Sequence, residues 1–193
     1  MSLAERLRRS LLLPASEPLL PGDLPEQSEA LAVPAAVLIA ITDRAEPGVI
    51  LTVRREDMRT HAGQVAFPGG RIDPGESAAE AALREAQEEI LLDPGQCDVV
   101  GAIEPYRTVT SYLVTPICAV IPPDLPLEPH ESEVADWFEP PLHFLLDPAN
   151  HQQRSALFRG ETRHYHEILW EDRRIWGATA AMIVNLSRRL QWR

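Results

Sequence analysis

Glu88 and Glu89 follow Glu85 at spacings of three and four residues. On a helix these spacings place the three carboxylates on one face, where like charges repel. Arg84 stands four residues before Glu88, so its guanidinium can hold that carboxylate in place. Carboxylate oxygens gathered in this way suit Mg²⁺ or Mn²⁺, and such an ion would relieve the repulsion. The alternative is an acidic helix face that is merely solvated.

The elements that must position these side chains begin with a predicted helix over residues 77–91. Ser77 and Glu80 form a capping box at its start, and a proline–glycine pair follows its end. At about 100° per residue, small and apolar side chains fill one arc, and the three acids lie beside that arc. A glycine pair and a Pro-Gly turn precede the helix, which lets main-chain carbonyls approach the acids. Both features favour a metal site over a solvated face.

The rest of the chain predicts one α/β domain with a mixed sheet. Residues 1–34 form a lead-in that is expected to hold a short amphipathic helix at 2–13, and residues 35–193 form the main domain. The β-branched apolar runs at 35–42 and 48–55 are expected to be paired strands. Further strands are expected at 63–70, 98–103 and 114–121, a strand with a short helix at 133–146, a hairpin at 164–177 and a closing helix at 178–190.

Length and composition limit the function classes. The chain has 193 residues with 45% hydrophobic residues, which suits one domain with a full core. Its net charge of −11 argues against non-specific binding to nucleic acid or to an anionic membrane. Cys97 and Cys118 have no metal-ligand spacing, and free thiols fit a reducing cytoplasm, where we expect the protein. An anionic substrate would need arginines or a metal ion to bind.

The spacing of Gly70, Glu76 and residues 84–90 resembles the Nudix box, a glycine, a glutamate and an arginine–glutamate–glutamate core at fixed intervals. The resemblance implies an α/β/α sandwich with a mixed sheet, with residues 35–193 as the Nudix domain. It also implies Mg²⁺- or Mn²⁺-dependent hydrolysis of a diphosphate linked to a nucleoside or another organic group. It implies that Glu85 and Glu89 are the main metal ligands, that the Gly69 carbonyl completes the metal shell and that Glu76 braces the loop. Glu88, paired to Arg84, is either a further ligand or orients water.

The sequence departs from the box at Leu91, where the family has a glycine. A left-handed conformation at this position would cost leucine roughly 1–2 kcal/mol. Because Leu91 lies beyond the acids, we expect a changed helix end and an active enzyme.

The segment before the box, residues 50–70, resembles the corresponding segment of Nudix coenzyme A diphosphatases. The matching residues are Leu51, Thr52, Arg54, Arg59, Gly63, Phe67, Pro68, Gly69 and Gly70, whereas Arg55 replaces a small residue. Arginine matches phosphate in a bidentate fork. The expected substrate-binding residues are Arg54, Arg59, His61, Gly63, Phe67 and Gly70, and Arg55 is expected to pair with a surface acid such as Glu56 or Asp57.

Together these resemblances imply a small-molecule substrate, coenzyme A or acyl-coenzyme A, cleaved to 4′-phosphopantetheine and adenosine 3′,5′-bisphosphate. The candidates for the general base are Glu85, Glu88 and a loop acid, Glu131 or Glu133. Two alternatives stay open. One is a Nudix hydrolase of another substrate, such as ADP-ribose, NADH or a nucleoside triphosphate. The other is a catalytically silent Nudix module that binds a ligand, which only Leu91 supports.

Overall fold

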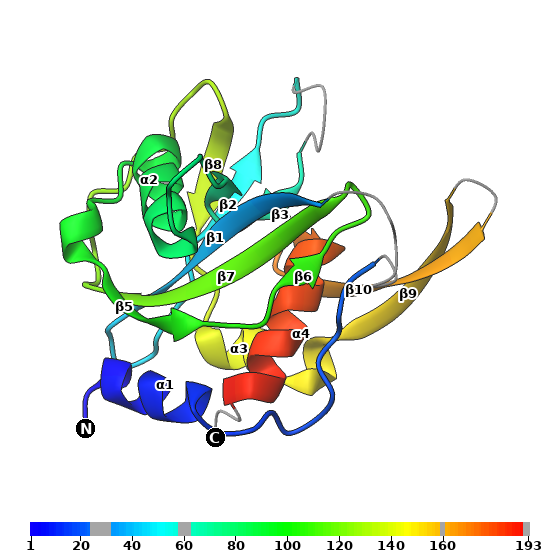
Figure 1. Ribbon diagram of the computed structural model, residues 1–193, viewed down its shortest axis with the longest axis horizontal. Helices are drawn as coiled ribbons and strands as arrows, with labels where there is room; N and C mark the ends of the chain where they lie inside the picture. Colours follow the sequence, from blue (N-terminus) through cyan, green and yellow to red (C-terminus); the bar gives the residue numbers. More distant parts are fainter. Residues whose placement is uncertain (24–31, 58–62, 159–160, 191–193) are drawn as a thin grey trace.

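The central sheet of the molecule has the strand order β4-β1-β7-β5, and β6 pairs with the far end of β7 (Figure 1). In this computed structural model the described residues are 1–23, 32–57, 63–158 and 161–190. β1 and β7 run parallel and the other pairs are antiparallel, so the sheet is mixed. The strands are β1 (Val33–Thr42), β4 (Gly69–Arg71), β5 (Asp98–Ala102), β6 (Tyr106–Arg107) and β7 (Tyr112–Ile121).

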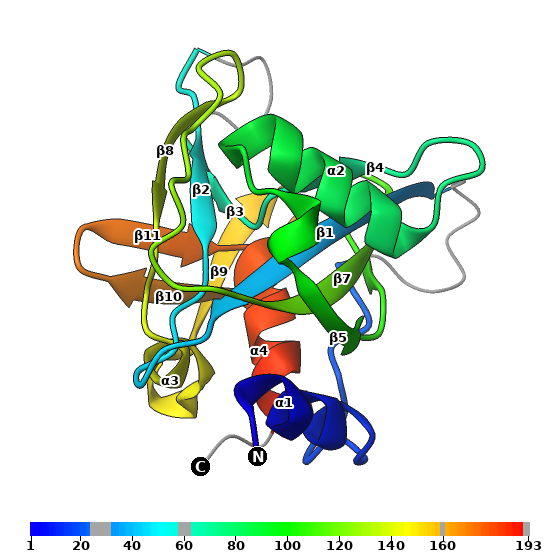
Figure 2. The same cartoon turned by 90° about the vertical axis from the view of Figure 1, so that its left-hand side faces the viewer.

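Helices cover both faces of this sheet. The helix α2 (Ala78–Ile90) lies on one face, and α4 (Ala178–Leu190) and α1 (Leu3–Leu11) lie on the other (Figure 2). Alternate side chains of β1 explain the two layers. Leu38 packs with the apolar residues of α2, whereas Ile39 packs with those of α1 and α4. A strand buried on both faces needs a continuous apolar run, as β1 has, and the expected α/β/α sandwich with a mixed sheet is confirmed.

Two smaller sheets complete the fold. One has the order β3-β2-β8 and the other the order β11-β10-β9. The paired strands β9 and β10 extend away from the body of the molecule (Figure 1). Among the described residues, no helix is long and apolar enough to cross a membrane. The strands are β2 (Leu51–Arg54), β3 (Val65–Ala66), β8 (Val134–Phe138), β9 (Gln152–Phe158), β10 (Glu161–Trp170) and β11 (Arg173–Trp176); the short helices are α3 (Leu142–Leu146), η1 (Pro94–Gln96) and η2 (Pro148–Asn150).

The structure corrects the expected pairing of the first two strands. β1 and β2 belong to different sheets, and the expected pairing is limited to the antiparallel bridge between Ile41 and Val49, just before β2. The Thr42 N–H donates to the Gly48 carbonyl and the Ile50 N–H donates to the Ala40 carbonyl beside this bridge. Both edges of β1 are taken, by β4 and by β7, so β2 turns away to pair with β3 and β8. The expected strand at 63–70 is likewise divided into β3 and β4. Phe67 and Pro68 separate the two pieces, and they join different sheets.

The described part of the lead-in packs against the main domain. Leu3, Ala4 and Leu7 of α1 are buried in the apolar cluster that contains Ile39. The side-chain amide of Asn185 on α4 accepts a hydrogen bond from the Leu20 N–H at 2.7 Å and donates one to the Leu20 carbonyl at 2.9 Å. Residues 1–23 are therefore integrated into the core, and the division at residues 34 and 35 remains an expectation.

Candidate active site

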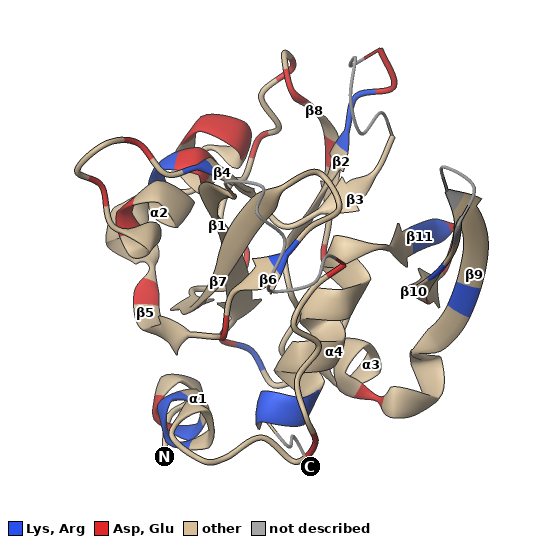
Figure 3. Ribbon diagram, turned by 45° about the vertical axis from the view of Figure 1, so that its right-hand side comes forward, with Lys and Arg blue, Asp and Glu red and all other residues tan. Residues whose placement is uncertain are grey.

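The glycine pair brings the β4 backbone into contact with the helix α2. A Cβ atom added at Gly70 would lie 2.4 Å from Glu85 Oε1, so only glycine leaves room for this carboxylate. A Cβ atom at Gly69 would lie 2.4 Å from the Ala36 carbonyl oxygen on β1. The two glycines therefore allow a close approach on both sides of β4. Acidic side chains gather on α2 and on the connections that flank it (Figure 3).

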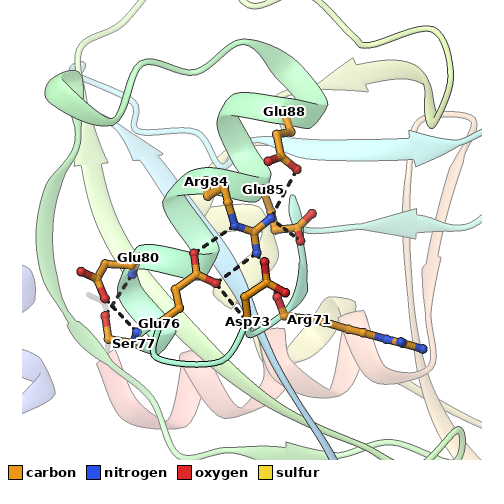
Figure 4. Close-up of polar contacts among 8 residues, drawn as sticks. All are labelled: Arg71, Asp73, Glu76, Ser77, Glu80, Arg84, Glu85 and Glu88. Atoms are coloured by element: carbon orange, nitrogen blue, oxygen red, sulfur yellow. Dashed lines mark hydrogen bonds and ion pairs between the residues drawn. The ribbon is translucent and has the colours of Figure 1, made fainter.

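Arg84 is the centre of an ion-pair network on α2 (Figure 4). Its guanidinium donates to both oxygens of Glu76, at 2.9 and 3.1 Å, and this hydrogen bonding lowers the pKa of Glu76. It also donates to Glu85 at 2.9 Å and to Glu88 at 3.3 Å. A fifth contact, to the Arg71 carbonyl at 3.0 Å, ties the helix to the end of β4. Arg84 thus joins the loop after β4 to the helix and holds Glu88, as the four-residue spacing predicts.

Glu89 lies deeper than the other two acids, with 4% of its surface exposed. The pKa of Glu89 is raised to about 8, chiefly by burial and in smaller part by the nearby carboxylates of Glu85 and Glu133. The opposing contacts are weak, since the Gly69 N–H donates at 3.3 Å and Arg54 Nη1 lies 3.9 Å away. Burial also raises the pKa of Glu85, although Arg84 opposes this shift. The positive charge near the buried acids is therefore too small to balance their negative charge, and a cation would stabilise their ionised forms.

The donor set fits a magnesium or manganese ion that shares its ligands with a substrate. No group of three or more His, Cys, Asp or Glu side chains in the described ranges is arranged to hold a metal ion by itself. Mg²⁺ commonly takes one or two carboxylates and completes its shell with water and substrate phosphates. Glu85, Glu89 and the Gly69 carbonyl could provide such a partial shell. Glu88 is held by Arg84 and is 60% exposed.

The expected substrate-binding residues lie in different surroundings. Arg54 is placed beside Glu89, at the end of β2. Gly63 has a positive φ of 67° and donates its N–H to the Arg54 carbonyl at 3.1 Å, so it forms the turn that leads to β3. Phe67 is only 3% exposed and packs in the core cluster. Arg59 and His61 lie outside the described residues.

The loop acids approach the helix from the other side. Glu133 stands directly before β8 and is close enough to raise the pKa of both Glu85 and Glu89. The loop that carries it is bound to the end of α2, where the His130 N–H donates to the Glu89 carbonyl at 2.7 Å. The sequence offered Glu133 as one candidate base without showing that it lies near both Glu85 and Glu89, and no motif indicated His130.

The expected change of the helix end at Leu91 is not seen: α2 ends there as it would with a glycine. Leu91 adopts the left-handed conformation, with φ 55° and ψ 27°, that a glycine would take there. Its side chain points into solvent, and its N–H donates to carbonyls of the last helical turn. The helix end therefore keeps its geometry at the cost of local strain. The silent-module alternative loses its support.

Comparisons with known proteins agree with this geometry. The NUDIX domain family matches residues 32–159. A protein of Escherichia coli strain K12, described as an uncharacterized Nudix hydrolase NudL, is 44% identical over 154 residues, or 79% of this chain and 80% of that protein. A protein of Shigella boydii serotype 18 with the same description is 43% identical over 154 residues, with the same coverage.

A solved structure gives an independent likeness in fold alone. The Nudix hydrolase RenU from M. smegmatis superposes with a TM-score of 0.50 at 22% identity, over 57% of this chain and 71% of that chain. The family match covers most of the residues that form the central sheet, α2 and the site. This chain therefore belongs to the Nudix family and is a Nudix hydrolase, a diphosphatase.

Proposed function

We propose that this Nudix hydrolase cleaves the diphosphate of coenzyme A or acyl-coenzyme A, giving 4′-phosphopantetheine and adenosine 3′,5′-bisphosphate. The observation that carries the proposal is the match of residues 50–70 to the coenzyme A diphosphatase segment, together with the position of Arg54. Its guanidinium lies 3.9 Å from the buried Glu89. An arginine guanidinium next to an acid cluster can bind a phosphate group of a diphosphate substrate through two parallel hydrogen bonds.

Nudix hydrolases generally use a divalent metal ion. Held by Glu85 and Glu89, such an ion would polarise the diphosphate and lower the pKa of a water molecule. Arg54 would bind a phosphate oxygen on the side of β2. Arg84 would keep the loop after β4 and the helix in one arrangement through Glu76. Glu88, the third acid of the box, would be a further ligand or would orient the water.

Among the candidates for the general base we favour Glu133. Arg84 donates hydrogen bonds to the carboxylates of both Glu85 and Glu88, so these two acids already belong to its ion-pair network. Within the part of the chain that the structure describes, no arginine side chain is paired with the Glu133 carboxylate. Glu133 is exposed and lies near Glu85 and Glu89, so it can accept a proton from water at the cluster.

The test is identification of products by mass. The protein is incubated with Mg²⁺ or Mn²⁺ and with coenzyme A, ADP-ribose or NADH in parallel, and Glu89→Gln serves as the control. Release of 4′-phosphopantetheine by the wild type, with little from the variant, is the expected result. Turnover of ADP-ribose or NADH but not of coenzyme A would overturn the substrate assignment and leave the Nudix chemistry standing.

A further inference from the structure

The loop that carries Glu133 is fixed to the last turn of α2. The His130 N–H donates to the Glu89 carbonyl at 2.7 Å, and the Glu128 N–H donates to the Ile90 carbonyl at 3.1 Å. The carbonyls of a last helical turn have no partners within the helix, so they are free to accept these bonds. Glu89 thus has its carboxylate in the acid cluster and its carbonyl bound to the loop. One end of the loop is placed directly against the metal-binding acids.

Arg55 fixes the other end of the same loop. Its backbone N–H donates to the Glu133 carbonyl at 3.2 Å, and its guanidinium Nη1 donates to the Glu131 carbonyl. The remaining guanidinium donors bind Asp57 in a fork, Nε to Oδ1 at 2.8 Å and Nη2 to Oδ2 at 2.7 Å. The expected pairing of Arg55 with Asp57 is therefore confirmed. It also orients the guanidinium toward the Glu131 carbonyl.

We propose that Arg55 is a positioning residue for Glu133. This role rests on the proposed function of Glu133 as the general base. The turn between the two anchors closes through the Glu133 N–H, which donates to the His130 carbonyl at 3.0 Å. His130 Nδ1 and Ser132 Oγ are 2.7 Å apart and brace its middle. Without the Arg55 side chain, the turn keeps its helix anchor and loses its side-chain anchor at Glu131. The Glu133 carboxylate then samples more positions relative to Glu85 and Glu89.

This role differs from substrate binding and from simple surface pairing. Phosphate is bound by a pair of donors on one edge of a guanidinium, whereas three of the five N–H donors of Arg55 bind protein groups and the Nε–Nη2 edge is taken by Asp57. An exposed ion pair contributes little to stability, and the Arg55 side chain is 39% exposed. Loss of the side chain therefore has a small effect on unfolding and a larger one on the chemical step.

The first measurement compares kcat and KM of the full-length wild type and variants with coenzyme A and Mg²⁺. Arg55→Ala is expected to lower kcat about tenfold, because misplacing a catalytic group by a fraction of an ångström is costly, and to leave KM within about threefold. The kcat of Arg55→Lys is expected to lie between those of the wild type and Arg55→Ala, since one ammonium cannot hold both Asp57 and the Glu131 carbonyl. Arg44→Ala is the matched control. Arg44 is similarly exposed, at 35%, and pairs with Asp124 and Glu139.

The second measurement places Arg55→Ala in a Glu133→Gln background. If Arg55 acts through Glu133, its removal costs less than about twofold in kcat once the base is gone. An undiminished loss in that background would overturn the proposal, as would a rise in KM with kcat unchanged, which indicates phosphate binding. A drop in Tm of Arg55→Ala that accounts for the lost activity would also overturn it.

Failure of the proposed substrate is distinguishable from failure of this inference. If the wild type cleaves ADP-ribose or NADH and not coenzyme A, the same pair of variants is measured with that substrate and the same outcomes decide. If coenzyme A is cleaved and Arg55→Ala matches Arg44→Ala in kcat, the function stands and the positioning role is wrong.

Discussion

Two glutamates of this protein expose little of their surface to solvent and have opposite surroundings. Glu89 on α2 is 4% exposed and Glu167 on β10 is 5% exposed. Glu167 accepts hydrogen bonds from Arg174 at 2.5 Å and from Arg154 at 3.0 Å, and these arginines lower its pKa. Glu89 has Arg54 at 3.9 Å and two acids nearby, and its pKa is raised by burial to about 8.

The difference shows what a buried carboxylate contributes in each place. On β10 one acid is shared by two arginines, so its charge is satisfied within the protein and the cluster stabilises the sheet. On α2 the acids outnumber the arginines that contact them, so the folded protein alone leaves the charge uncompensated. In Figure 3 red segments predominate over blue ones around α2, whereas blue segments predominate on the strands β9 to β11. A deficit of positive charge is the physical sign of a cation site.

The largest expected effect comes from neutralising Glu89. Glu89→Gln should lower kcat/KM by at least about 100-fold, because it removes a charge that holds the metal at the reacting diphosphate. The amide cannot ionise in the buried site, so the Tm of the metal-free protein should stay the same or rise. Steady-state kinetics and thermal unfolding measure the two effects. A loss of activity matched by a comparable loss of stability would contradict the assignment of Glu89 to the metal site.

The converse is expected at Glu167. Glu167→Gln removes the carboxylate that Arg154 and Arg174 share, and because both guanidinium groups are about half exposed and can bind water, the free energy of unfolding should fall by about 1 kcal/mol. Activity at a temperature well below the Tm should remain near that of the wild type. Denaturant unfolding and a kinetic assay on the same preparation test both statements. If this variant lost activity as Glu89→Gln does, the distinction between the two clusters would fail.

The pH dependence of stability should also separate the two glutamates. The unfolded pKa of glutamate is about 4.3. Because the folded-state pKa of Glu89 is raised, Glu89 stabilises the metal-free protein fully below the unfolded pKa. This stabilisation is lost as the pH rises toward about 8. The lowered pKa of Glu167 makes its contribution present above the unfolded value and lost as the pH falls through the folded one.

Unfolding with a chelator between pH 5 and pH 8 measures this difference. The wild type should lose stability relative to Glu89→Gln as the pH rises, and added Mg²⁺ should restore it more at pH 8 than at pH 5. A constant difference between the two proteins over this range would show that the Glu89 carboxylate is not destabilised by burial.

The smallest expected effect lies at the end of α2, next to Glu89. Leu91→Gly removes the left-handed strain of a leucine with φ 55° and should raise the free energy of unfolding by about 0.5–1 kcal/mol. Activity should stay within about twofold of the wild type, because the backbone already has the glycine geometry. Denaturant unfolding measures the gain. A destabilised variant would mean that the Leu91 side chain contributes packing that offsets the strain.

The sequence predicted the local part of the site well. The capping box of Ser77 and Glu80, the helix over Ala78–Ile90 and the contact between Arg84 and Glu88 all follow from spacings of three or four residues. Interactions over such distances depend on the helix alone. The positions of the strands were predicted better than their pairing, since β1 and β2 do not form the expected pair. Phe67 also lies in the core, although its place in a motif suggested contact with a substrate.

The sequence by itself determined which acids share a helix face, which arginine accompanies them and which family they belong to. Only the tertiary structure decided that Glu89 is the buried acid, that Glu133 approaches it, and that Arg55 and His130 hold the loop between them. The reason is that burial and long-range contacts arise when separate segments pack. Residues 54–55, 85–89 and 128–133 meet in space although no local pattern links them. Burial in turn sets the charge balance on which the proposed metal site depends.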